Sequence, residues 1–161
     1  MSNSPSPELT EYFHNKAELW RVYVQAYSGI NTFIDKALRK HANIKLDDFQ
    51  VLTVLTDGGV HTDPPRQVRM GQIATALNLS PSRLTYHIER LIEKGWVERA
   101  AVEEDRRGKG VFITEAGYER YMEGFKVHSN LINNVITADI SAKEIETMTE
   151  AMKKMLDSIN P

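Results

Sequence analysis

Hydrophobic side chains recur at three- and four-residue steps over long stretches of this chain, which is typical of amphipathic helices. Such stripes run over residues 8–41, 115–136 and 141–159. The third stretch opens with Ser141 and has Glu144 three residues later, which is the pattern of a capping box. We therefore expect long helices at both ends of the chain.

A shorter helix is predicted from Pro81 to the residue before Gly95. Ser80 is a good N-cap, proline suits the first helical position, and glycine closes a last turn in the left-handed conformation. The apolar residues of this segment fall on one side of the helix: Leu84, Ile88, Leu91 and Ile92. Its polar residues fall on the other side, with Arg83 at the margin: Ser82, Tyr86, Glu89, Arg90 and Glu93. We therefore expect the apolar face to pack into the core and the polar face to be exposed to solvent.

Residues 70–79 predict a second short helix directly upstream, which Asn78 can stop because asparagine tolerates the left-handed conformation. The short connection between the two helices is that of a helix-turn-helix, whose second helix enters the major groove of DNA. A hairpin is predicted next, with strands at 96–100 and 111–113 and a charged loop at 103–110. Its basic tip can reach phosphates or a narrow minor groove, or it is a solvated turn.

The segment from about Leu46 to Gly117 resembles the MarR family of bacterial transcription regulators. The most specific part is Asp105-Arg106-Arg107 followed by residues 111–117, which is similar to the D-x-R wing and the L-T-x-x-G close of that family. The resemblance implies a mainly α fold with a small β-wing: a winged helix-turn-helix flanked by long N- and C-terminal helices that form a dimerisation domain.

The resemblance also implies which residues contact DNA. Arg107 is the wing arginine, and Asp105 orients it by charge pairing. The complete predicted set is Ser80, Ser82, Arg83, Thr85, Tyr86, His87, Arg90, Asp105, Arg106, Arg107 and Lys109. Tyr86 and His87 depart from the arginine and aliphatic residue that are frequent in the family. The connection at residues 58–69 is longer than usual, either for a functional reason or as a tolerated insertion.

The predicted organisation is a disordered tail at 1–7, a dimerisation helix at 8–43, the DNA-binding domain at 44–117 and dimerisation helices at 118–161. The outer stripes are more apolar than one winged helix can cover, so we expect a two-fold homodimer; the alternative is the helical core of a monomer. A dimer should read a roughly palindromic operator with half-sites about 10 base pairs apart. Acidic Glu89 and Glu93 are expected to pair with Arg90 and Arg83, or else to accept from cytosine.

By resemblance, the chain is a repressor that leaves double-stranded DNA when a small effector binds, often an aromatic or phenolic anion. The candidate effector-binding residues are Trp20, Arg21, Tyr23 and Tyr27. An aromatic stripe is alternatively plain core. Two other functions stay open: a winged-helix module that binds a protein instead of DNA, and a metal-responsive regulator of the same fold.

Composition narrows these possibilities. The chain has 161 residues and no cysteine, which removes thiolate chemistry and fits the cytoplasm. From its apolar pattern and polar N-terminal residues we expect neither a membrane span nor a signal sequence. The net charge is −2, but residues 66–110 carry nine basic and six acidic side chains, so positive charge gathers in the predicted DNA-binding part. The five histidines show no metal-binding spacing, and no catalytic motif is present. We expect no cofactor, no metal and no enzymatic activity.

Overall fold

The computed structural model describes residues 7–56, 65–100 and 110–159, except for the side chains of residues 7–14 and 100. It forms two compact units, Met1–Val127 and His128–Pro161. α1 begins at Pro7, which was predicted to be the last residue of the disordered tail. Residues 1–6 lie outside the described residues, so the rest of the tail stays a prediction. Most of the unusual connection at 58–69 and the wing tip are also outside them.

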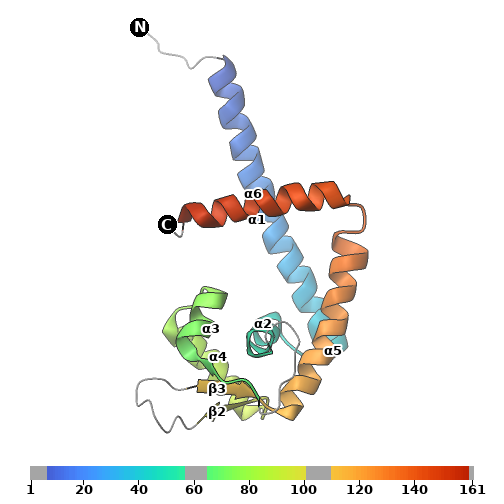
Figure 1. Cartoon of the computed structure of the whole chain (residues 1–161). Coiled ribbons are helices and arrows are strands. Elements are labelled where there is room, and N and C mark those ends of the chain that lie inside the picture. The colour runs from blue at the N-terminus through green and yellow to red at the C-terminus, as the bar shows by residue number, and fades with distance from the viewer. Residues whose placement is uncertain (1–6, 57–64, 101–109, 160–161) are drawn as a thin grey trace. The chain divides into compact units, whose positions relative to one another are not determined.

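The described chain is mostly helical, as predicted (Figure 1). The helices are α1 Pro7–Ala42, α2 Leu46–Leu55, α3 Met70–Leu77, α4 Pro81–Glu93, α5 Glu115–Leu131 and α6 Ala142–Ile159. The helix that the sequence predicts from 115 to 136 changes character near its end, because Ile132–Ile136 form a wider π-helical turn. The dimerisation role of the outer helices stays a prediction, since it concerns a second copy of the chain.

A small antiparallel sheet stands beside α4. Its strands are β1 Val68–Arg69, β2 Val97–Ala100 and β3 Gly110–Ile113, in the order β1-β3-β2. Val97 pairs with Ile113, and Val68 pairs with Val111 on the other edge of β3. The prediction of two strands was therefore incomplete, because the two residues of β1 are too few to show an alternating pattern.

The predicted N-cap and the predicted helix ends around α4 are confirmed. Ser80 is the N-cap and its hydroxyl accepts from the backbone N–H of Arg83 at 3.4 Å. Asn78 ends α3 with φ 50°, and Gly95 follows α4 with φ 70°, both in the left-handed region. In the C-terminal unit the carboxylate of Glu144 accepts from the backbone N–H of Ser141 at 2.9 Å, as a capping box requires.

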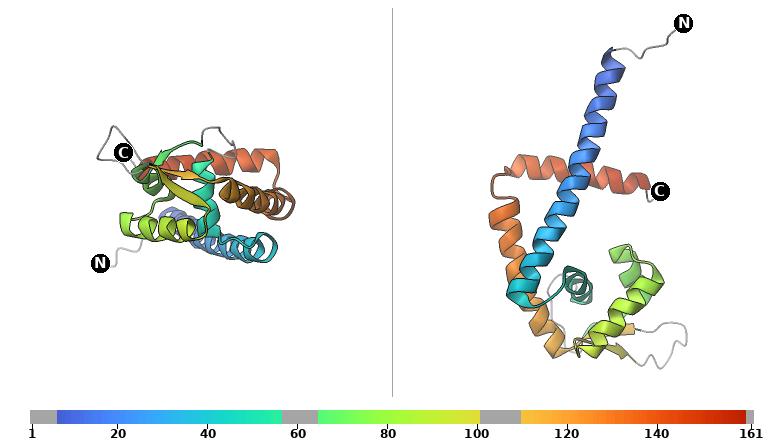
Figure 2. Two further views of the ribbon diagram at one scale, coloured as in Figure 1. Left: turned by 90° about the horizontal axis from the view of Figure 1, so that it is seen from below. Right: turned by 180° about the vertical axis from the view of Figure 1, so that it is seen from behind.

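The core of the N-terminal unit forms around α2, which contacts α1, α3, α4 and β3 (Figure 2). The buried side of this helix includes Val51 and Leu52 together with the charged Asp48, so the helix shows little amphipathic pattern. Phe49 stacks on Tyr121 of α5 with ring centroids 5.5 Å apart. The α4 side chains predicted for the core, Leu84, Ile88 and Leu91, are buried, whereas Ile92 is half-buried.

A tight junction fixes the start of α5 against the end of α4. The hydroxyl of Thr114 donates to the carbonyl of Gly95 at 2.7 Å and accepts from the N–H of Gly117 at 3.0 Å. Gly117 lies so close to the chain that a Cβ there would be 2.0 Å from the carbonyl oxygen of Trp96. A glycine is needed here because of this close approach, which holds the base of the wing to the end of α4.

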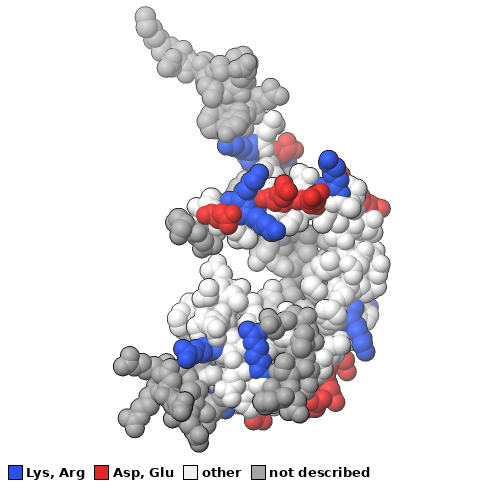
Figure 3. All heavy atoms as spheres, viewed as in Figure 1, with Lys and Arg blue, Asp and Glu red and all other residues white. Residues whose placement is uncertain are grey.

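The C-terminal unit carries a strongly amphipathic helix. The apolar side chains of α6 that the structure exposes are Ile145, Met148, Met152, Met155, Leu156 and Ile159. Basic and acidic side chains lie along the face of this helix that Figure 3 shows. No helix in the described ranges has the length and apolar content to cross a membrane.

Candidate nucleic-acid interface

The outward side of α4 is a polar surface on a well-anchored helix. We call it the reading face and define it by its exposed residues: Ser82, Arg83, Thr85, Tyr86 and Glu89. The largest of these side chains is Tyr86, which is 65% exposed. The opposite side of α4 is packed into the core and α3 lies against the helix, so the reading face is held in a fixed direction.

The hydroxyl groups at the start of α4 are partly used within the helix. Thr85 donates to the carbonyl of Pro81 at 2.9 Å, and the hydroxyls of Ser80 and Ser82 lie 3.3 Å apart. Their oxygens keep lone pairs that can accept further hydrogen bonds. The first turn of the helix also presents backbone N–H groups, which favour phosphate oxygens.

Arg83 is the reading-face cation that remains available for a ligand. It is exposed, and among the described residues its guanidinium forms no ion pair. Arginine can donate two parallel hydrogen bonds to a phosphate or to the edge of guanine. Its position in the first turn of α4 suits either target.

Arg90 is placed differently from the sequence prediction. Its side chain is 18% exposed and pairs through Nη2 with Oδ1 of Asp48, which is fully buried on α2. Burial alone would lower the pKa of Arg90, but the hydrogen bond to Asp48 and its negative charge raise that pKa above the ordinary value. The expected pairing of Arg90 with a glutamate of its own helix is therefore wrong.

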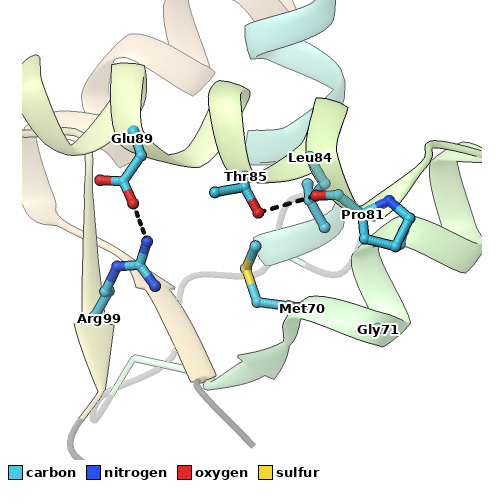
Figure 4. Close-up of a pocket in the computed structure, with 8 residues that line it drawn as sticks. Met70, Gly71, Pro81, Leu84, Thr85, Glu89 and Arg99 are labelled. Carbon is cyan, nitrogen blue, oxygen red and sulfur yellow. Dashed lines mark hydrogen bonds and ion pairs between the residues drawn. The ribbon is translucent and has the colours of Figure 1, made fainter.

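Glu89 also finds a different partner. Its Oε1 pairs with Nη2 of Arg99 on β2, so the carboxylate links α4 to the base of the wing (Figure 4). This ion pair stands at the edge of a cavity of about 400 Å³ between α3, α4 and β2. The cavity is lined by Met70, Gly71, Ala74, Pro81, Leu84, Thr85, Glu89 and Arg99. The predicted pairing of Glu89 within α4 is wrong because the neighbouring strand supplies a closer cation.

His87 is turned towards the interior. The sequence prediction includes it among the DNA-contacting residues, whereas the structure leaves the residue only 5% exposed. Its ring meets the Tyr86 ring edge-on with centroids 5.9 Å apart, and its Nδ1 lies 3.4 Å from Nη2 of Arg90. One helical step of 100° separates it from Tyr86, which is enough to move it from the reading face to the margin of the core.

A second cavity lies along the reading face itself. It has a volume of about 400 Å³ and is lined by Asp47, Ser82, Arg83, Tyr86, His87 and Arg90. The structure thus brings five of the predicted DNA-contacting residues of α4 around one hollow. The remaining predicted contacts on the wing tip, Asp105, Arg106, Arg107 and Lys109, lie outside the described residues.

Three of the four predicted effector-binding residues form an aromatic row on α1. Trp20 and Tyr27 are exposed, and Tyr23 stacks on both of them with centroid separations of 5.6 and 6.4 Å. Arg21 lies 3.8 Å from the carboxylate of Glu18. Within the N-terminal unit these aromatic rings are therefore not core, and their role with an effector stays a prediction. Within the described ranges, no cluster of three potential metal ligands is found.

Comparison with known proteins agrees with this geometry. Residues 43–108 match the model of the MarR family. The HTH-type transcriptional regulator MhqR of Bacillus subtilis is 31% identical over 138 residues, which cover 86% of this chain and 89% of that protein.

Two solved structures have the same fold. Sco3205, a MarR family transcriptional regulator of Streptomyces coelicolor solved in complex with DNA, aligns with a TM-score of 0.81 and 23% identity, covering 91% of this chain and 92% of that one. The transcriptional regulator BldR of Sulfolobus solfataricus aligns with a TM-score of 0.76 and 25% identity, covering 91% and 97% of the two chains. The chain belongs to the MarR family of transcription regulators.

Proposed function

We propose that this protein is a homodimeric regulator that recognises a specific duplex DNA operator with α4 in the major groove. The observation that carries the proposal is the reading face of α4. It offers the exposed guanidinium of Arg83, hydroxyl groups and an exposed phenol, while the other side of the helix is packed into the core. Groups of this kind form hydrogen bonds with base edges and phosphates, whereas a protein-binding face would show apolar anchors.

Dimerisation is supported by apolar surface that each of the two units, taken by itself, leaves exposed. The outer helices expose large apolar side chains, namely Leu19, Trp20, Val22, Val24, Tyr27 and Phe33 on α1, together with the six listed above on α6. Exposed apolar area on this scale marks an association surface. Two copies related by a two-fold axis would present two reading faces to half-sites about 10 base pairs apart.

Regulation follows from the same arrangement. We infer that the protein acts as a repressor in the cytoplasm, where the DNA is, and that a small aromatic or phenolic anion releases it. The row of Trp20, Tyr23 and Tyr27 supplies stacking surface for such an effector, whereas Arg21 faces another side of α1 and pairs with Glu18. A coupling of about 1–3 kcal/mol between effector and DNA would be enough to lower operator occupancy markedly.

The test uses a duplex that the full wild-type chain selects from a randomised pool. Binding is measured by fluorescence anisotropy in the presence of excess scrambled duplex. We expect Arg83→Ala to weaken binding of the selected duplex about 5- to 100-fold, because one bidentate base contact has this value. The matched control is Lys153→Ala, which removes an equal charge from the exposed polar face of α6 and should leave binding unchanged.

Two outcomes contradict the proposal. If the wild-type chain enriches no sequence from the pool, it is not a sequence-specific DNA-binding protein. If Arg83→Ala and Lys153→Ala weaken binding equally, the reading face has no special role and the attraction is only general electrostatics. A footprint without two-fold symmetry would contradict the dimer.

A further inference from the structure

A fully buried carboxylate stands beneath the reading face. Asp48 lies on α2 and both of its oxygens are taken: Oδ1 by Nη2 of Arg90 and Oδ2 by Nζ of Lys94 at 2.8 Å. A buried carboxylate is costly unless it is paired and hydrogen-bonded, so this geometry is strongly preferred over any in which one partner leaves. Asp48 thereby ties α2 to the last two turns of α4.

Arg90 passes this constraint on to the reading face. Its guanidinium carbon lies 5.6 Å from the ring centroid of Tyr86, one helical turn earlier on the same face. At this distance a cation is attracted to the face of an aromatic ring. Because Asp48 holds the guanidinium of Arg90 in one position, the Tyr86 ring keeps this contact only in its present rotamer. That rotamer is therefore favoured over the others.

Lys94 fixes the other end of the helix. Its Nζ reaches Asp48 and also lies 4.4 Å from the centroid of Trp96, which directly precedes β2. The same carboxylate thus sets both the rotation of α4 about its axis and the start of the wing. Among the described ionic contacts of α4 and its C-cap, those of Arg90 and Lys94 are the two made to a fully buried partner.

We propose that Asp48 is a positioning residue for DNA recognition, which acts through Arg90 to hold Tyr86 in the orientation that contacts a base. Asp48 itself is buried and touches no DNA. The inference rests on the proposed function and adds to it a specificity-determining pair, Tyr86 and its buried support. An aromatic side chain that is already ordered loses less freedom on binding, which is worth roughly two- to tenfold in affinity.

The test is a double-mutant cycle between residues 48 and 86, which do not touch each other in any described contact. The readout is the ratio of affinities for the selected duplex and for a scrambled duplex of equal composition, measured with the full chain. We expect Tyr86→Ala to lower this ratio about tenfold and Asp48→Asn to lower it roughly two- to tenfold. In the Tyr86→Ala background, Asp48→Asn should then have almost no further effect.

A merely structural role for Asp48 would give a different result. Loss of stability alone lowers the folded fraction and therefore both apparent affinities by the same factor, so Asp48→Asn would then leave their ratio unchanged in both backgrounds. The control is Ile34→Ala, which opens the buried core at α1, away from α4. It should lower the melting temperature and leave the ratio unchanged with and without Tyr86. The folded fraction of every variant is checked by circular dichroism at the temperature of the binding assay.

A second variant covers the case in which Asp48→Asn does not fold. Arg90→Lys keeps a cation for Asp48 but removes the planar group beside Tyr86, so it should lower the ratio in the wild-type background and not in the Tyr86→Ala background. The inference is overturned if the effects of Asp48→Asn (or Arg90→Lys) and Tyr86→Ala on the ratio are additive. It is also overturned if Asp48→Asn (or Arg90→Lys) alone leaves the ratio unchanged. In both cases the proposed function stands. Failure of the wild-type chain to select any duplex overturns both.

Discussion

Asp35 on α1 supplies a cap for a different helix, and its removal should cost a measurable part of the stability. Its Oδ1 accepts from the backbone N–H of Leu46 at 2.9 Å, and its Oδ2 accepts from Nε of Arg39 at 2.6 Å. The residue at the N-cap position of α2, Lys45, makes no side-chain cap. The carboxylate of Asp35 therefore does from a neighbouring helix what an N-cap residue normally does.

Asp35→Ala should lower the free energy of unfolding by about 1–2 kcal/mol, because a lost N-cap costs about that amount. The partly exposed pair with Arg39 adds only a few tenths of a kcal/mol. Asp35→Asn keeps an oxygen acceptor for Leu46 and should cost less than about 1 kcal/mol. For a chain of this length, thermal unfolding should show a shift of roughly 2–4 °C per kcal/mol. Equal melting temperatures for wild type and Asp35→Ala would refute the capping role.

The same carboxylate predicts a pH dependence with a definite sign. Burial alone would raise the pKa of Asp35, but the hydrogen bonds from Arg39 and Leu46 and the charges of Arg39 and Lys45 lower it below the ordinary value. Because the pKa is lower in the folded state, the stabilisation is complete above the unfolded pKa and is lost as the pH falls through the folded value. The stability gap between wild type and Asp35→Asn should therefore shrink in acid below about pH 4. A gap that stays constant or widens there would refute this explanation.

Three further substitutions test the packing and the assembly. Gly117→Ala places a Cβ against the carbonyl of Trp96, so it should lower the free energy of unfolding in urea by about 3 kcal/mol; an unchanged midpoint would contradict the close approach. Phe49→Ala removes a buried stacked ring and should cost about 3–5 kcal/mol in the same assay; a loss under about 1 kcal/mol would contradict its burial. Met152→Glu puts a charge on the apolar side of α6 and should yield folded monomers in sedimentation, whereas Lys153→Glu on its polar side should not; dimers in both would place the interface elsewhere.

The elements that sequence predicts best are those with signals in their own few residues. Ser80, Pro81 and Gly95 mark the ends of α4 because a cap, a fixed φ and a left-handed residue act on adjacent backbone groups. The long amphipathic helices follow for the same reason, since their periodicity repeats over many turns. Neither conclusion needs any knowledge of what lies across the fold.

Two elements gave no such signal. β1 has only two residues, and its pairing partner Val111 lies more than forty positions away, so the pattern along the chain does not reveal it. α2 has the charged Asp48 on its buried side and the apolar Leu46 and Val54 outside its buried set, and therefore lacks the separation of polar and apolar faces by which a surface helix is recognised. Both depend on tertiary packing, which the linear pattern does not contain.

The charged side chains of α4 show how contacts that the linear pattern does not reveal affect the predicted function. A helical wheel places Glu89 and Arg90 on the outer side, yet the structure gives their charges to Arg99 and to the buried Asp48. Among the described basic residues of α4 and its C-cap, Arg83 is then the one whose charge is free for DNA. Because each phosphate contact adds about one unit to the salt dependence, α4 should contribute little to it and the specific hydrogen bonds of its reading face correspondingly more. A helix that carries several cations in the sequence therefore behaves as a reader of bases more than as a binder of phosphate.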